Sequence, residues 1–215
     1  MCGSCWAFGS ASVIESRVNR LFAKHYKQPL FQMSEQAIVD CLWSKGNMEE
    51  MTGLHGCDGG FANEVMERII DQYDGKLAPL ASYPYMSQDM ACQQDKWNYD
   101  AARMVSFSNP ASTGELKYAL LDGPVTVAIG VTPKMTFYSG GIFNDAECVD
   151  NDPDFLNHQV VVTGWGYDQD TNQEYWIIRN SWSNAWGVDG YIYIAFGSCG
   201  VTLEATVPNF ELNQQ

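Results

Sequence analysis

Apolar residues recur at helical spacing in the first half of the chain. Over residues 6–24, Ile14, Val18 and Leu21 share one face, with polar residues between them. Ser34 is suited to cap a short helix that follows it. We therefore predict three helices, over residues 6–24, 34–41 and 63–73.

The second half changes to β-rich runs. A connector rich in Ser, Asn, Pro and Gly is predicted near residues 107–115, followed by one short helical stretch at 115–122. The strand-like runs lie at residues 124–131, 159–166, 174–180 and 190–196. Because no long helix separates these runs, an antiparallel sheet or barrel is favoured over a parallel doubly wound sheet. The pattern predicts an α+β protein whose functional groups lie between the two halves.

Composition narrows the function classes. The 215 residues are 46% hydrophobic and 18% charged, which excludes a disordered segment. The 26 acidic residues outnumber 12 basic ones, for a net charge of −14, and no block of Lys or Arg interrupts them. A nucleic acid is therefore not expected as a partner. No apolar run reaches the roughly 18 residues of a membrane span, so no membrane association is expected.

The seven cysteines carry more information than the charge does. Six of them can pair as a disulfide framework, which leaves one thiol outside it. They stand at positions 2, 5, 41, 57, 92, 148 and 199, and this spread suits bridges between distant segments better than a metal knuckle. No metal or other cofactor is expected.

The segment CGSCWAF places Cys5 at the predicted start of the first helix. There the helix dipole and the first backbone N–H groups favour the thiolate, which is the nucleophilic form of cysteine. Three other interpretations compete: half of a disulfide, a redox CxxC pair with Cys2, or half of a zinc site. The zinc site lacks a second ligand pair, and the redox pair lacks the preceding strand that it normally follows.

A thiol nucleophile needs a base, and the chain has three histidines. His158 opens an apolar run, whereas His25 and His55 stand in polar surroundings. A lone histidine at a strand end is more often structural than catalytic. Asn180 follows a later strand-like run and could orient the imidazole of His158, with the indole of Trp182 or Trp186 keeping water off their hydrogen bond. The order Cys, His, Asn thus predicts a nucleophile, a base and an orienting residue.

Four segments in order, CGSCWAF, GCDGGF, LNHQVVVTGWG and RNSWSNAWGVDGYIYI, resemble the signatures of the papain-like cysteine peptidases, the family of papain and the lysosomal cathepsins. The resemblance covers nearly the whole chain. It implies a two-domain fold, with a helical left domain at residues 1–106, an antiparallel β-barrel right domain at residues 107–215 and the active-site cleft between them.

The resemblance also implies roles for individual residues. Cys5 is the expected nucleophile, His158 the general base and then acid, and Asn180 the orienting residue. The remaining cysteines fall where the family has bridges, which implies the pairs Cys2–Cys57, Cys41–Cys92 and Cys148–Cys199. The implied activity is that of an endopeptidase that hydrolyses peptide bonds through a thioester acyl-enzyme.

Further positions are implied to contact an extended polypeptide substrate. Gly59 and Gly60 would pair with its backbone. The pocket that usually decides specificity would have Glu204 at its base, as cathepsin B has an acidic residue there, and so would accept Arg. An exposed Glu without such a role is an equal alternative. The remaining residues expected at the substrate are Phe61, Ala62, Ala128, Leu156, Gln159 and Trp182.

One part of the family pattern is missing. The family stabilises its oxyanion with the backbone N–H of the nucleophile and a Gln side chain six residues upstream, a position that would precede Met1. Loss of one such donor costs about 100- to 1000-fold in rate. We therefore expect either an incomplete sequence of an active enzyme or a short form without activity. A non-catalytic papain-fold protein is the alternative function.

Partners and location also follow from the resemblance. A propeptide and protein inhibitors of the cystatin type are the expected protein partners, and the chain is expected to be a monomer. Disulfides would have no use in a reducing cytosol, so the parent protein is expected to be lysosomal or secreted.

Overall fold

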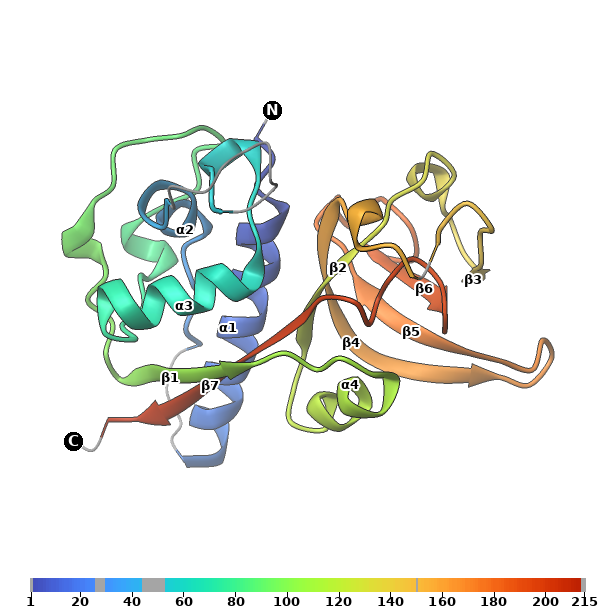
Figure 1. Ribbon diagram of the computed structural model, residues 1–215. Helices are drawn as coiled ribbons and strands as arrows, with labels where there is room; N and C mark the ends of the chain where they lie inside the picture. Colours follow the sequence, from blue (N-terminus) through green and yellow to red (C-terminus); the bar gives the residue numbers. More distant parts are fainter. Residues whose placement is uncertain (1, 26–29, 44–52, 150, 214–215) are drawn as a thin grey trace. The chain divides into compact units, whose positions relative to one another are not determined.

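The computed structural model describes residues 2–25, 30–43, 53–149 and 151–213 (Figure 1). The chain divides into two compact units. The first consists of residues 1–108 and 207–215, and the second of residues 109–206. Since the placement of one unit relative to the other is not determined, each is described by itself.

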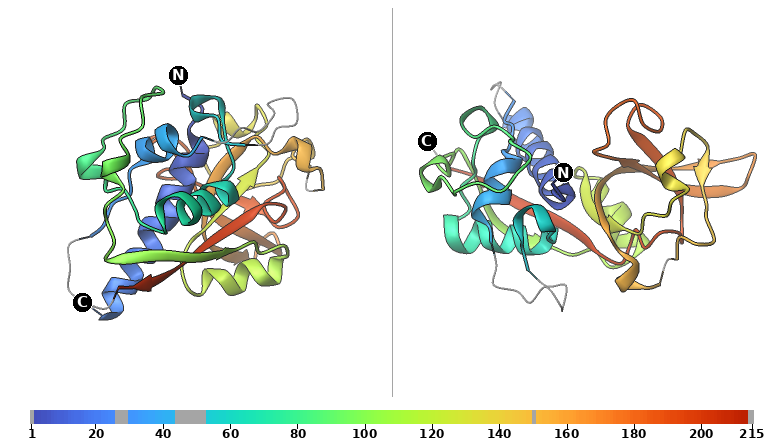
Figure 2. Two further views of the ribbon diagram at one scale, coloured as in Figure 1. Left: turned by 60° about the vertical axis from the view of Figure 1, so that its left-hand side comes forward. Right: turned by 90° about the horizontal axis from the view of Figure 1, so that it is seen from above.

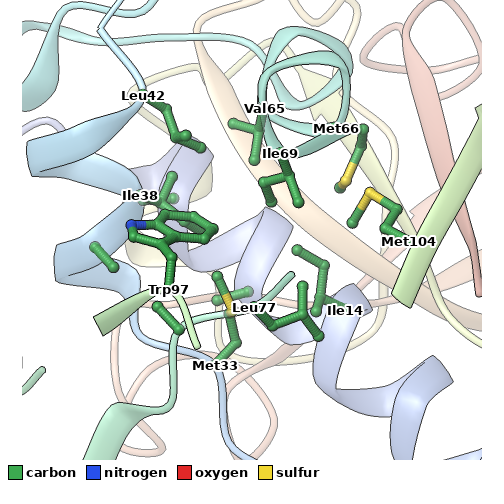
Figure 3. Close-up of a cluster of buried hydrophobic side chains, with 14 of the residues drawn as sticks. Ile14, Met33, Ile38, Leu42, Val65, Met66, Ile69, Leu77, Trp97 and Met104 are labelled. Carbon is green, nitrogen blue, oxygen red and sulfur yellow. The ribbon is translucent and has the colours of Figure 1, made fainter. Parts of the chain in front are cut away.

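The first unit is built on three α-helices around one core. They are α1 (Cys5–His25), α2 (Glu35–Cys41) and α3 (Ala62–Tyr73). One short 3₁₀ turn, η2 (Gly56–Asp58), lies between α2 and α3, and two more, η3 (Leu80–Ser82) and η4 (Gln94–Lys96), follow α3. Figure 3 shows apolar side chains from the helices, from the connecting segments and from strand β1 (Ala102–Ser108) converging on one centre. The fully buried members include Ile14, Met33, Ile38, Val65, Ile69 and Leu77.

The predicted helices are confirmed in place, and on α1 Ile14 and Val18 are fully buried, whereas Leu21 is only partly buried. Ser34 caps α2 as expected, because its side chain accepts a hydrogen bond from the backbone N–H of Ala37. In α3, Val65, Met66 and Ile69 are buried at the spacing of one helix face. Apolar periodicity therefore located these helices within a few residues.

Two strands of the first unit were not predicted. Strands β1 (Ala102–Ser108) and β7 (Ala205–Leu212) pair antiparallel, with Met104 opposite Phe210. Figure 2 shows them side by side. The sequence assigned residues 207–215 to the second domain, whereas here they belong with the first unit because they pair with β1. The expected connector also begins later, since β1 continues to Ser108.

The second unit is a sheet with one helix against it. Its strands are β2 (Val125–Ile129), β3 (Ile142–Phe143), β4 (His158–Asp168), β5 (Gln173–Arg179) and β6 (Tyr191–Ala195). The helix is α4 (Thr113–Leu120), and two further 3₁₀ turns are η5 (Met135–Phe137) and η6 (Pro153–Phe155). The four long strands and the helix are the ones that the sequence predicted.

The strand order in this unit is β7-β2-β4-β5-β6-β3, where β7 contributes its first residues. The pairs β2–β4, β4–β5 and β5–β6 are antiparallel as expected. The prediction was incomplete in two respects: β3 pairs with β6 in parallel, and no pairing among the described residues joins β3 back to β7. The sheet is therefore open rather than a closed barrel. None of the described helices is long and apolar enough to cross a membrane.

Candidate active site

Cys5 is the first residue of α1, and the segment before it is tightly fixed. Cys2 is bonded to Cys57, and the backbone N–H of Gly3 donates to the carbonyl of Cys57 over 2.7 Å. A Cβ on Gly3 would lie 2.7 Å from that carbonyl oxygen, so only glycine allows this approach. The first turn of α1 contains no acidic residue that would oppose a thiolate.

The GCDGG segment packs against the start of α1. The indole N–H of Trp6 donates to the carbonyl of Gly56 over 3.1 Å. Gly59 has φ 127°, a conformation that favours glycine. A Cβ on Gly60 would lie 2.8 Å from both Leu54 and Trp6, so glycine brings the backbone close to the indole. Among the described residues, neither the N–H nor the C=O of Gly60 has a hydrogen-bond partner.

His158 and Asn180 meet within the second unit. His158 is the first residue of β4, and Asn180 directly follows β5. These strands are antiparallel, with Val161 opposite Arg179, so the start of one lies beside the end of the other. Nε2 of His158 and Oδ1 of Asn180 are 2.8 Å apart. With the amide oxygen as acceptor, Nε2 carries the proton and Nδ1 is left as the basic nitrogen.

Trp182 covers this pair. Its ring stacks on the imidazole of His158, with centroids 5.0 Å apart and planes 28° from parallel. His158 is buried, and this burial lowers the pKa of its imidazole below 6.5, while the hydrogen bond to Asn180 opposes the shift. A neutral imidazole with a fixed tautomer is the form that can accept a proton.

Three disulfides are present among the described residues, two within the first unit and one within the second. They are Cys2–Cys57, Cys41–Cys92 and Cys148–Cys199, the same pairs that the resemblance implied. Cys5 is the cysteine outside them. No group of three or more His, Cys, Asp or Glu side chains in the described part of the chain is placed to hold a metal ion.

The family described as papain family cysteine protease matches residues 1–209. The chain belongs to the papain family of cysteine proteases. Procathepsin L of Rattus norvegicus is 36% identical over 215 residues, which cover 96% of this chain and 59% of the relative. A cathepsin L-like protein of Caenorhabditis elegans is 35% identical over 214 residues, with 97% and 58% covered.

Solved structures agree with this assignment. Bromelain from Ananas comosus, in complex with the E64 inhibitor, has a TM-score of 0.78 at 30% identity and covers 98% of this chain and 90% of that chain. Digestive procathepsin L 3 of the Tenebrio molitor larval midgut has a TM-score of 0.76 at 32% identity, with 96% and 63% covered. The papain-like α+β fold class is thereby confirmed. The chain spans under two thirds of the length of the two curated relatives above.

The specificity residues expected from the papain family lie in both units. In the second, Ala128 is opposite Gln159, and its N–H donates to the carbonyl of Glu204 over 2.9 Å. The amide of Gln159 donates to Thr126, so its polar end is bonded within the sheet. Leu156 is buried just before β4.

In the first unit, Phe61 is the N-cap residue of α3, and Ala62 is fully buried behind it. Ala62 thus contributes packing beneath the surface, and Phe61 has the more exposed side chain of the two.

Two supporting residues of this papain-family site were missed from the sequence. Asn157 fixes the turn before His158, because its Oδ1 accepts from the N–H of Val131 over 2.9 Å. Tyr85 shares a hydrogen bond with Ser4, which is 81 residues away in the chain. Local patterns carry no signal for contacts at such separations.

Proposed function

We propose that this chain is a cysteine-type endopeptidase that hydrolyses peptide bonds through a thioester acyl-enzyme. The observation that carries the proposal is the hydrogen bond between His158 and Asn180 beneath the ring of Trp182. A histidine held in one tautomer and shielded from water is arranged as a base rather than as a structural residue. Membership of the papain family and Cys5 at the start of α1 supply the matching nucleophile.

The proposed reaction has two stages. In the first, Cys5 transfers its thiol proton to His158 and the resulting thiolate attacks the peptide carbonyl carbon. The C–N bond then breaks as His158 passes that proton to the leaving amine. The acyl group is then bound to Cys5 as a thioester. In the second stage, water loses a proton to His158 and attacks the thioester, which releases the carboxylic acid and regenerates the thiolate. Asn180 holds the imidazole in place throughout.

An extended polypeptide is the proposed substrate. The N–H and C=O of Gly60 have no partner among the described residues, so they can pair with the backbone of such a chain. Glu204 is proposed to let the specificity pocket accept Arg as well as apolar side chains. We expect Glu204→Ala to lower kcat/KM for an Arg substrate relative to the Phe analogue; an unchanged ratio would exclude this role.

The test of the function combines turnover and labelling. We expect the chain to hydrolyse a fluorogenic peptide and E64 to attach to Cys5 without added reductant. Cys5→Ser should abolish both. Asn180→Ala should lower kcat by about 100-fold, because a misplaced catalytic group costs about that much. The matched control Asn209→Ala, at an exposed position on β7, should leave both unchanged.

Two outcomes of this test contradict the proposal. Absence of hydrolysis together with absence of labelling at Cys5 would favour a non-catalytic papain-fold protein. Hydrolysis that survives Cys5→Ser would place the chemistry elsewhere.

A lysosomal or secreted location and a monomeric state are part of the same proposal. Three disulfides favour an oxidising compartment on the route of synthesis. Relatives named as procathepsins and a proform structure support a propeptide as a partner. Inhibitors of the cystatin type are proposed because they would occupy the same extended-chain site.

A further inference from the structure

Three helices of this protein begin directly after a serine, and one of them is capped differently. Ser34 and Ser112 both accept a hydrogen bond from the backbone N–H three residues on, at 2.9 and 3.3 Å. This is the ordinary role of an N-cap serine. Before α1, the N–H of Ala7 is instead bonded to the carbonyl oxygen of Ser4, over 2.9 Å.

The hydroxyl of Ser4 is turned to Tyr85. Its Oγ lies 2.6 Å from the Oη of Tyr85, and Ser4 is buried. The ring of Tyr85 also packs edge-on against Phe8, with centroids 4.9 Å apart. Tyr85 therefore contacts the first turn of α1 on both sides of Cys5 in the sequence.

The loop that carries Tyr85 is itself held by buried side chains of α2. Gln36 accepts from the N–H of Met86 over 2.7 Å, and Asp40 accepts from the N–H of Met90 over 2.9 Å. Both Gln36 and Asp40 are buried. This backbone anchoring gives the Tyr85 hydroxyl a fixed position relative to the helix start.

We propose that Tyr85 is a positioning residue that diverts the Ser4 hydroxyl from capping α1, so that the positive end of the helix acts on the thiolate of Cys5. A serine oxygen that capped Trp6 or Ala7 would place partial negative charge next to the thiolate and reduce the effect of the helix dipole. The inference rests on the proposed role of Cys5 as nucleophile. It assigns to Tyr85 no contact with substrate.

The test is the pH dependence of Cys5 alkylation by iodoacetamide, with the labelled residue identified by mass spectrometry. Tyr85→Phe keeps the ring against Phe8 and removes only the hydroxyl. At pH values below the midpoint of the pH–rate curve, we expect this variant to be alkylated about two- to fivefold more slowly than the wild type. This is the size of a helix-terminus charge effect. The plateau rate at high pH should stay the same, because only the thiolate fraction changes. Loss of local structure would lower the rate at every pH.

Ser4→Ala separates diversion from simple loss of a hydrogen bond. This variant has no hydroxyl to cap the helix. We therefore expect the inflection of its curve of alkylation rate against pH to lie at the same pH as in the wild type. The double variant Ser4→Ala with Tyr85→Phe should return to that pH as well. Tyr118→Phe, at an exposed position on α4, is the matched control and should change nothing.

Each contrary outcome has a distinct meaning. If Tyr85→Phe leaves the inflection unmoved, or if the double variant keeps the shift, the proposed role of Tyr85 is wrong while the nucleophile assignment stands. If wild-type Cys5 reacts as an ordinary thiol, with an inflection near pH ~8.5, both the nucleophile and the role of Tyr85 are overturned.

Discussion

Replacing Tyr83 by Phe removes one hydroxyl from the buried polar centre of the first unit. Tyr83 is 2% exposed, and its Oη donates to Oδ2 of Asp40 over 2.8 Å and accepts from the N–H of Gln93 over 3.2 Å. A hydrogen bond to a charged group contributes about 1.5–3 kcal/mol, and an orphaned buried amide costs about 1 kcal/mol or more. Since phenylalanine keeps the ring volume, we expect about 3 kcal/mol of destabilisation.

The difference in stability between the wild type and Tyr83→Phe should also depend on pH, which gives a second quantity to measure. Burial, together with the hydrogen bond to Asp40, raises the pKa of Tyr83 to about 12. A group whose pKa is higher in the folded state stabilises the fold below its unfolded pKa of about 10, and that contribution is lost as pH rises toward 12. Between pH 9 and pH 11, the wild type should therefore lose about 1 kcal/mol of its free energy of unfolding. The gap in the free energy of unfolding between the wild type and Tyr83→Phe should narrow by that amount.

Equilibrium urea unfolding, followed by tryptophan fluorescence, measures both the destabilisation at pH 7 and its change between pH 9 and pH 11. Tyr118→Phe is the control, because Tyr118 is 78% exposed and its loss should cost under about 0.5 kcal/mol. A gap below about 0.5 kcal/mol for Tyr83→Phe at pH 7 would refute the assigned hydrogen bond. A gap that stays constant from pH 9 to pH 11 would refute the ionisation argument alone.

Three further perturbations follow from the same contacts. Because burial lowers the pKa of His158, the unfolded state binds a proton more readily than the folded state does. The free energy of unfolding should therefore fall as pH drops through about 6.5. His158→Gln should abolish this dependence in urea titrations. Gly3→Ala should cost about 1–3 kcal/mol by forcing Cβ against the carbonyl of Cys57, measured as a lower thermal midpoint. Replacing Cys148 and Cys199 by Ser opens a bridge across a separation of 51 residues and should cost about 4 kcal/mol; an unchanged urea midpoint would contradict this.

The parts of the fold that the sequence predicted are those with local signals. Ser34 before an apolar helical face predicted α2, and the apolar run after His158 predicted β4. Strand β7 was missed because it contains Pro208, which weakens a strand assignment, and because its partner β1 lies about a hundred residues earlier. The parallel pairing of the two-residue β3 has no local pattern at all.

In the candidate site, too, the sequence predicted some features, whereas others depend on contacts that form only in the folded chain. The order of Cys5, His158 and Asn180 along the chain was enough to suggest their roles. The hydrogen bond between His158 and Asn180 depends on the β4–β5 register, which a one-residue slip would destroy. The contact of Tyr85 with Ser4 depends on how α2 holds a loop, and no spacing rule encodes that.

Strand β7 has a consequence for biosynthesis. Ala205 and Thr206 pair with β2, whereas residues 207–212 pair with β1, so the unit that contains Cys5 is completed by a strand that follows the whole second unit in the chain. On the ribosome, residues 109–206 are synthesised in full before the first unit receives its closing strand. The nucleophile segment of the first unit is therefore present early in translation, yet its unit can finish folding only after β7 has been made.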